Sequence, residues 1–273
     1  MGIDAGGHTD RGLVRQSNED AYQIEKSLDL FVLSDGMGGQ AHGEIASKLA
    51  VETVVAHCRE AQNNRATPLF GESRPDLSEC TNRLASAVTL ANRRIFDMAS
   101  AHADLCGMGA TIVAIWISGD RLSLAHVGDS RAYLLRGGML EQLTADHSLV
   151  AEHVRRGIMT PQEAEASQLQ SVLVKALGFD EKVEADADEQ ILLAGDTLLL
   201  CSDGLTRMVT DPEIASTLMT VEPAQAAAQR LVELANDYGG QDNITAIVVK
   251  VAPGSNGILS RLRLWSKHSP RSA

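Results

Sequence analysis

The chain is organised around residues 28–39, Leu-Asp-Leu-Phe-Val-Leu-Ser-Asp-Gly-Met-Gly-Gly. The apolar run 30–33 predicts a buried strand, and this strand ends at Asp35. Three of the four residues after Asp35 are glycine, so the backbone there can approach other groups closely. The stretch therefore predicts a strand that presents a carboxylate at the edge of a sheet.

Two other stretches also place an acid at a strand end. An apolar run ends at Asp203 in residues 198–205, and Asp242 comes just before a predicted strand at 244–251. Three such carboxylates, far apart in sequence, suggest one convergent acidic site. Such a site must bind cations or keep some of its carboxyl groups protonated.

Composition limits the class of protein. The chain has 273 residues, enough for one large domain with a mainly aliphatic core, since only 3% of residues are aromatic. A net charge of −12 argues against binding to nucleic acid. The four cysteines are scattered and form no C-x-x-C pair, which favours reduced thiols and no zinc. With no signal peptide or transmembrane stretch in the sequence, we expect a cytoplasmic protein.

The middle of the chain reads as consecutive antiparallel strands separated by glycine turns, which argues against a parallel, doubly wound sheet. The polar segment 5–20 fits a charged surface turn or a group of functional residues equally well. A hairpin is expected between 191–193 and 197–201. Strands are also expected at 22–25, 30–33, 110–117, 121–127, 132–136, 139–143, 172–177 and 244–251, and helices at 44–60, 84–101, 148–156, after 160, after 210 and at 222–238.

We expect one domain at residues 1–252, followed by a tail at 253–273. The tail carries four basic residues and no acid, so its charge is +4 and that of the body is −16. Apolar and basic residues alternate in the tail, which fits a short amphipathic helix on an acidic partner or membrane surface. A disordered or loosely docked terminus is the alternative.

Eight sequence blocks, in order and covering nearly the whole chain up to Val251, resemble those of the protein phosphatase 2C family, the metal-dependent Ser/Thr phosphatases, in its bacterial form. The blocks are Arg15-x-x-Asn18-Glu19-Asp20, Ser34-Asp35-Gly36-Met37-Gly38-Gly39, Gly109-Ala110-Thr111, Val127-Gly128-Asp129-Ser130-Arg131, Asp146-His147-Ser148, Lys175-Ala176-Leu177-Gly178, Cys201-Ser202-Asp203-Gly204-Leu205 and Asp242-Asn243-Ile244-Thr245. The resemblance implies an α+β fold, a four-layer α-β-β-α sandwich of two packed, mainly antiparallel sheets flanked by helices. It also implies that segment 146–178 is the family's flap, which contributes to substrate choice.

The same resemblance implies a site for two Mn²⁺ or Mg²⁺ ions bridged by Asp35. Asp129 corresponds to a residue that helps to hold a third, weaker ion, although a structural turn aspartate fits that position equally well. The other implied ligands are Asp203 and Asp242 on one ion, and the Gly36 carbonyl, with waters held by Glu19 and Asp20, on the other.

The implied mechanism is a direct attack on phosphorus by a hydroxide that bridges the two ions, without a phosphoenzyme. Arg15 would bind the phosphate oxygens and stabilise the transition state. Bacterial members often carry a histidine where this chain has Gln40, so the proton for the leaving group would come from His42 or a metal-bound water. We expect His8, His126 and His147 to be structural and Cys201 to be a buried thiol.

The leading hypothesis is therefore a protein Ser/Thr phosphatase that acts on phosphorylated proteins and opposes a bacterial Ser/Thr kinase. A phosphoprotein-binding module with little turnover is the alternative from another class, and it predicts a lost ligand among Asp35, Asp203 and Asp242; none is lost. A hydrolase of small phosphoesters is not excluded. We expect a monomer.

Overall fold

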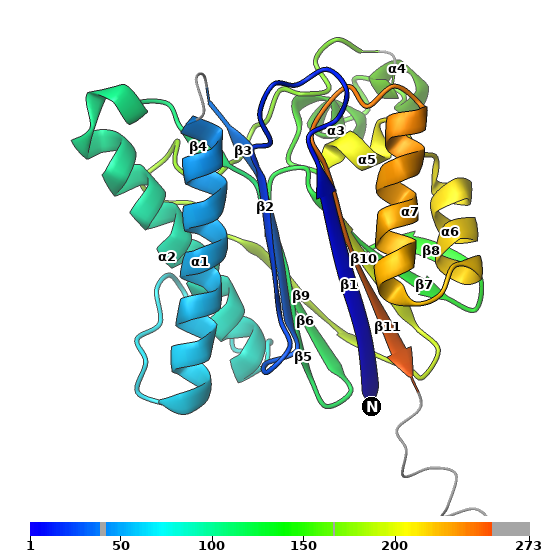
Figure 1. Ribbon diagram of the computed structural model, residues 1–273. Coiled ribbons are helices and arrows are strands. Elements are labelled where there is room, and N and C mark those ends of the chain that lie inside the picture. The colour runs from blue at the N-terminus through cyan, green and yellow to red at the C-terminus, as the bar shows by residue number, and fades with distance from the viewer. Residues whose placement is uncertain (39–41, 166, 253–273) are drawn as a thin grey trace, which may run out of the picture.

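Two β-sheets pack face to face, and helices cover the outer face of each. The computed structural model describes residues 1–38, 42–165 and 167–252. In Figure 1, α1 and α2 lie against one sheet, and α6 and α7 lie against the other. The bounds of these helices are His42–Asn63, Glu79–Ala101, Asp211–Thr220 and Ala224–Asp237. This arrangement confirms the predicted α+β class and the four-layer α-β-β-α sandwich.

Every strand pair in both sheets is antiparallel. The first sheet has the order β1-β11-β10-β7-β8, with bounds Gly2–Asp10, Ile244–Ala252, Thr197–Cys201, Arg131–Arg136 and Met139–Gln142. The second has the order β2-β3-β5-β6-β9, with bounds Asp20–Glu25, Leu30–Met37, Ile112–Ser118, Arg121–Val127 and Asp186–Ile191, and the short β4 (Gly109–Ala110) pairs with β3.

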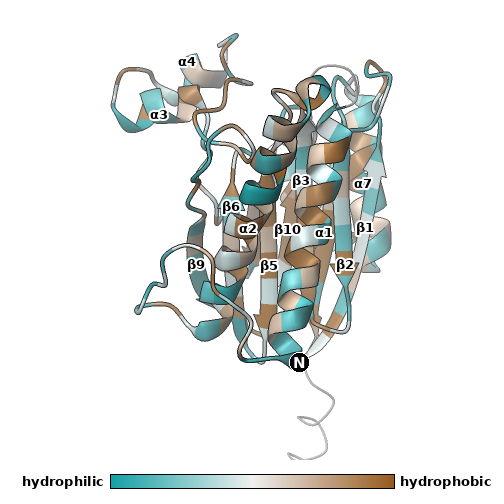
Figure 2. Ribbon diagram, turned by 90° about the vertical axis from the view of Figure 1, so that its left-hand side faces the viewer, coloured by the Kyte–Doolittle hydropathy of each residue, from teal (hydrophilic) through white to brown (hydrophobic). Residues whose placement is uncertain are grey.

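The core has three apolar layers, and β3 shows how one strand serves two of them. Leu30 and Val32 pack with α1 and α2, whereas Phe31 and Leu33 face the other sheet. Successive side chains of a strand point to opposite faces, so a strand buried on both faces reads as a continuous apolar run. The helices α1 and α2, which lie in front of the sheet in Figure 2, contribute their buried apolar residues to the same cluster as Leu30 and Val32.

The short helices α3, α4 and α5 lie near one end of the sandwich. α3 (Leu149–Arg155) and α4 (Pro161–Glu165) belong to segment 146–178 and project from the body, and α5 (Asp203–Thr206) directly follows β10. The predicted starts of α3, α4 and α6 are confirmed by their caps. Ser148 Oγ accepts from Ala151 N, and Thr160 and Thr210 form capping boxes with Glu163 and Glu213.

Several local predictions were wrong. Residues 191–193 and 197–201 do not form a hairpin, because β9 and β10 belong to different sheets and the chain crosses between them. The end of the acidic stretch 180–189, which gave no strand signal, forms most of β9, an edge strand paired only with β6 among the described residues. Residues 172–177, expected to form a strand, make only isolated bridges.

β1 was also missed, since the polar and glycine-rich residues 2–10 lack an apolar run. It pairs with β11 along its whole length. The tail 253–273 lies outside the described residues, so the expectation for it stays a prediction. Within the described part of the chain, no helix combines the length and apolar character needed to cross a membrane.

The layer between the sheets should dominate stability. Leu200 of β10 is fully buried in that layer. We expect Leu200→Ala to lower the free energy of unfolding by about 3 kcal/mol, because it removes buried methyl groups and leaves a cavity. Urea unfolding measures this. Met139→Ala is the control, since Met139 is 78% exposed and its truncation should change stability by no more than ~0.5 kcal/mol. Equal effects of the two variants would contradict this account of the core.

Candidate active site

The predicted carboxylates meet at one edge of the sandwich, near α5 at the top of Figure 1. Asp35 in β3 is the register partner of Asp20, the first residue of β2. Asp203 begins α5, Asp242 comes just before β11, and Asp129 lies between β6 and β7. Burial, together with the charges of these four neighbours, raises the pKa of Asp35 well above its usual value. The structure thus brings together five acids from both sheets.

Asp35 is held by the predicted Gly-Ala-Thr block. Thr111 Oγ1 accepts a hydrogen bond from Asp35 N at 3.0 Å, and Thr111 N donates to Asp35 O at 2.8 Å. The Thr111 hydroxyl also lies 2.7 Å from Ser130 Oγ, in the Asp129 block. These bonds fix the backbone at Asp35 and link it to the turn that carries Asp129.

Glu19, Gly36 and Gly43 pack closely beside Asp35. A Cβ at Gly36 would lie 2.1 Å from Gly43 O, and a Cβ at Gly43 would lie 2.1 Å from Glu19 Oε2. Only glycine therefore fits at both positions, and the Glu19 carboxylate rests against the first turn of α1. This close packing beside Asp35 is compatible with the predicted roles of the Gly36 carbonyl as a metal ligand and of Glu19 in holding metal-bound waters.

Two buried oxygens of the cluster, Asp20 Oδ1 and Asp203 Oδ1, have no hydrogen-bond partner among the described residues. Burial raises the pKa of Asp20 to about 7, although Thr245 and Ser202 donate to its other oxygen at 2.6 and 2.8 Å. Burial also raises the pKa of Asp203. Hard divalent cations take carboxylate oxygens and would offset this repulsion, so the residues present fit the predicted Mn²⁺ or Mg²⁺ ions.

Asp129 belongs to the same cluster. It is 8% exposed, and burial, followed by the charge of Asp203, raises its pKa to about 7. This environment is compatible with the cation-binding alternative, and the structural alternative stays open because burial raises the pKa of a structural aspartate as well.

Two arginines reach the acids from different elements. Arg15, in the loop between β1 and β2, donates from Nη2 to Asp242 Oδ2 at 2.8 Å. Arg207, at the end of α5, lies 2.5 Å from Asp203 Oδ2 and 3.8 Å from Asp242 Oδ2. Sequence analysis missed Arg207. Its spacing of four residues from Asp203, typical of a helical ion pair, was the available signal.

A groove of about 920 Å³ opens beside the acids. Its lining includes Asp129, Asp203 and Arg207, together with residues of segment 146–178 such as Val150 and Val154. The groove is therefore lined both by the predicted site and by the predicted flap.

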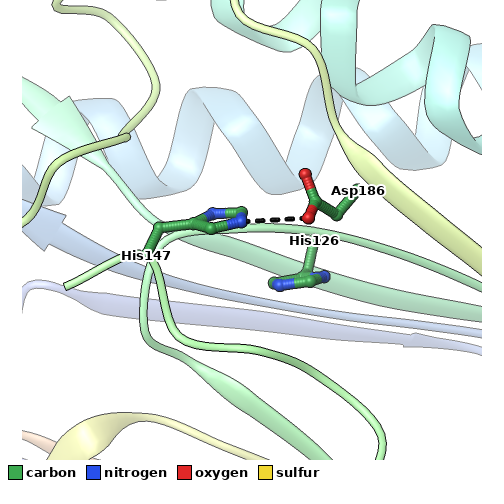
Figure 3. A group of neighbouring side chains, drawn as sticks. All are labelled: His126, His147 and Asp186. Atoms are coloured by element: carbon green, nitrogen blue, oxygen red, sulfur yellow. Dashed lines mark ion pairs between the residues drawn. The ribbon is translucent and has the colours of Figure 1, made fainter. Parts of the chain in front are cut away.

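A second group of side chains that could hold a metal ion is formed by His126, His147 and Asp186 (Figure 3). The two imidazole rings stack with centroids 4.8 Å apart. His147 Nδ1 accepts from Gly128 N at 3.0 Å, so its Nε2 carries the hydrogen and points at Asp186 Oδ2, 3.2 Å away. Asp186 also pairs with Lys175 at 2.6 Å.

This bonding disfavours a metal ion at the histidines, because the ligand nitrogen is protonated and an ammonium group lies beside the carboxylate. The contacts of His147 and Lys175 instead hold both ends of segment 146–178 against β6 and β9. They support the predicted structural roles of His126 and His147. Cys201 is fully buried, and burial raises the pKa of its thiol to about 12, as expected of an inert residue. His42 begins α1, whereas Gln40 lies outside the described residues.

The four-layer sandwich and its acidic edge fit the class of phosphatase that the sequence predicts, and comparison with known proteins identifies the family. The family model for protein phosphatase 2C matches residues 7–247. The chain is 37% identical to the serine/threonine phosphatase stp of Listeria monocytogenes over 245 residues, which are 89% of this chain and 93% of the relative. The chain therefore belongs to the protein phosphatase 2C family and is, by that membership, a serine/threonine phosphatase.

Solved structures agree with this assignment. The Mycobacterium tuberculosis serine/threonine phosphatase PstP/Ppp matches with a TM-score of 0.80 and 37% identity, over 92% of this chain and 99% of that one. A structure of the catalytic domain of PstP in complex with two manganese ions matches with a TM-score of 0.77 and 38% identity, over the same shares of the two chains.

The raised carboxyl pKa values predict an unusual pH dependence of stability without metal. Asp20 and Asp129 hold protons in the folded state up to about pH 7, whereas unfolded aspartates release them near pH 3.9. These bound protons stabilise the folded protein, and this stabilisation is fully present at low pH and is lost as pH rises through about 7. We therefore expect the melting temperature in EDTA to fall between about pH 5 and pH 8, and added Mn²⁺ to restore it.

Thermal unfolding at several pH values measures this effect. Asp20→Asn should flatten the slope, because an amide carries no charge to repel its neighbours. Asp104→Asn is the control, since Asp104 is exposed and far from the cluster in sequence. A melting temperature in EDTA that rises over this pH range would contradict the assignment of the buried acids.

Proposed function

We propose that the protein hydrolyses phosphoserine and phosphothreonine in proteins, using two Mn²⁺ or Mg²⁺ ions and a third, weaker ion at Asp129, and that it opposes a bacterial Ser/Thr kinase. The observation that carries this proposal is the cluster of Asp20, Asp35, Asp203 and Asp242 with an arginine beside it and an open groove leading to it. The serine/threonine phosphatase names of the relatives support the same substrate class.

Each residue has a distinct task in this proposal. Asp35, central in the cluster, would hold both ions, with Asp203 and Asp242 on one and the Gly36 carbonyl on the other, whose waters Glu19 and Asp20 would hold. The bound ions would supply an activated water for direct attack on phosphorus and would offset the charge of the carboxylates. Arg15, whose side chain is 56% exposed, has the freedom to bind the phosphate oxygens in a bidentate manner.

The groove favours protein substrates over small phosphoesters. Its volume of about 920 Å³ is larger than a phosphorylated side chain requires, and its lining includes apolar residues such as Val150 and Val154. An extended peptide could pack there while its phosphorylated residue reaches the acids. Segment 146–178 would then act as the flap of a single catalytic domain spanning residues 1–252.

The alternative is a phosphoprotein-binding module with little turnover. It requires a defect among the predicted ligands, whereas all of them are present and lie in one cluster. We also propose that the protein acts as a cytoplasmic monomer, a location that suits its four unpaired cysteines.

Phosphate release from a phosphothreonine peptide tests the proposed activity. We expect release with Mn²⁺ or Mg²⁺ and none in EDTA. Asp203→Asn should reduce turnover by roughly 100-fold or more, because it removes a charged ligand at the site of transition-state stabilisation, while circular dichroism shows an intact fold. Binding of the peptide without release under any metal would favour the binding module, and near-normal turnover of Asp203→Asn would exclude its role as a ligand.

Arg15 should act mainly on substrate binding. Arg15→Ala removes charge-assisted hydrogen bonds to phosphate, so we expect the Michaelis constant for the phosphopeptide to rise roughly 10- to 100-fold. Arg11→Ala is the matched control, because the side chain of exposed Arg11 donates to the Gln16 carbonyl at 3.3 Å and lies outside the acidic cluster. An unchanged Michaelis constant for Arg15→Ala would remove Arg15 from the phosphate site.

A further inference from the structure

Arg207 lies at the junction between the acidic cluster and the groove. It ends α5, which follows β10 at the top of the molecule in Figure 1. Its Nη2 is 2.5 Å from Asp203 Oδ2, and its Nη1 is 3.8 Å from Asp242 Oδ2. The side chain is 29% exposed, so the guanidinium is held in place and still reachable from the groove.

Arg15 and Arg207 approach the same atom. Arg15 Nη2 is 2.8 Å from Asp242 Oδ2, and Arg207 Nη1 is 3.8 Å from it. The two nitrogens can therefore be no farther apart than these two distances added together. A phosphate has oxygens on all sides, so two guanidinium groups at such a separation can bind one phosphate together.

The other arginines on the groove wall are committed elsewhere. Arg131 donates three hydrogen bonds to Asp146, at 2.7, 3.0 and 3.1 Å. Arg155 pairs with Glu152 on the same helix, α3. Arg207 differs from both because its carboxylate partners are the predicted cation ligands. Cations on those carboxylates would compete with the guanidinium for their charge, so Arg207 would find its counter-charge in an incoming anion.

We infer that Arg207 is a second phosphate-binding residue, which contacts the substrate phosphate from the groove side while Arg15 contacts it from the loop between β1 and β2. This inference rests on the proposed function and adds a residue to it. A peptide lying in the groove would pass Arg207 before its phosphate reached the acids, so Arg207 would also orient the phosphorylated side chain.

Binding of inorganic phosphate and of Mn²⁺ to the same variants tests this role. Calorimetry on the Mn²⁺-loaded protein should show phosphate binding to Arg207→Ala weakened by roughly 10-fold or more, as expected for a lost charge-assisted bond. Mn²⁺ binding without phosphate should be unchanged or tighter, because the substitution removes a positive charge next to the cations. Phosphate binding is thus weakened while Mn²⁺ binding is retained, a combination that a loss of folding cannot produce.

Matched variants sharpen the test. Arg207→Lys keeps the charge without the planar fork and should bind phosphate with intermediate affinity. Arg230→Ala is the control, because Arg230 also lies between two carboxylates, Glu233 and Asp237, at 3.6 and 3.7 Å, but on the surface of α7. It should behave like the unmodified protein with both ligands.

Two results would overturn the inference. Phosphate binding to Arg207→Ala within about twofold of the unmodified protein would show that Arg207 does not contact phosphate. Weakened Mn²⁺ binding together with weakened phosphate binding would show that Arg207 only orders Asp203 and Asp242. Failure of the proposed function itself would look different, since the unmodified protein would then release no phosphate from the peptide, whatever the calorimetry gives for Arg207.

Discussion

Repulsion among buried carboxylates at one sheet edge is the constraint on which the rest of the structure depends. Asp20 and Asp35 come from one sheet, and Asp203 and Asp242 come from the strand ends of the other. Bringing these charges together out of water is costly, and burial followed by the neighbouring charges raises the pKa of Asp20 and Asp35. The apolar layer between the sheets holds the two edges in register and thereby maintains this unfavourable arrangement.

Hydrogen bonds from one sheet to the other reinforce that arrangement next to the acids. Ser202 and Thr245, on the first sheet, donate to Asp20 on the second. Asn243 accepts from Glu19 N at 2.8 Å and donates to the Arg11 and Ser17 carbonyls. The side chains beside the predicted ligands therefore join the sheets, so the site and the sandwich form one unit.

Sequence reasoning succeeded where local pattern and fold agree. Apolar runs predicted the central strands because strands such as β3 are buried on both faces, and Ser, Thr and Pro signals predicted the starts of α3, α4 and α6. It failed for β1 and β9. These strands at the sheet edges need less apolar content, and their pairing with β11 and β6 depends on partners distant in sequence.

The site likewise contains residues that local sequence pattern predicts and one that depends on contacts between distant segments. The acids stand at strand ends next to glycines, a pattern visible in the chain, and the family resemblance assigned their roles. Arg207 carries no such signal, because its importance depends on how α5 directs the side chain toward Asp242, a residue brought in by another element. Arg15 and Arg207 both come from segments outside the sheets. Their positions are set by a loop and a single helical turn, whereas Asp20 and Asp35 are strand residues. Substitution of either arginine can therefore change the positive charge beside the acids while the second sheet still fixes these two carboxylates.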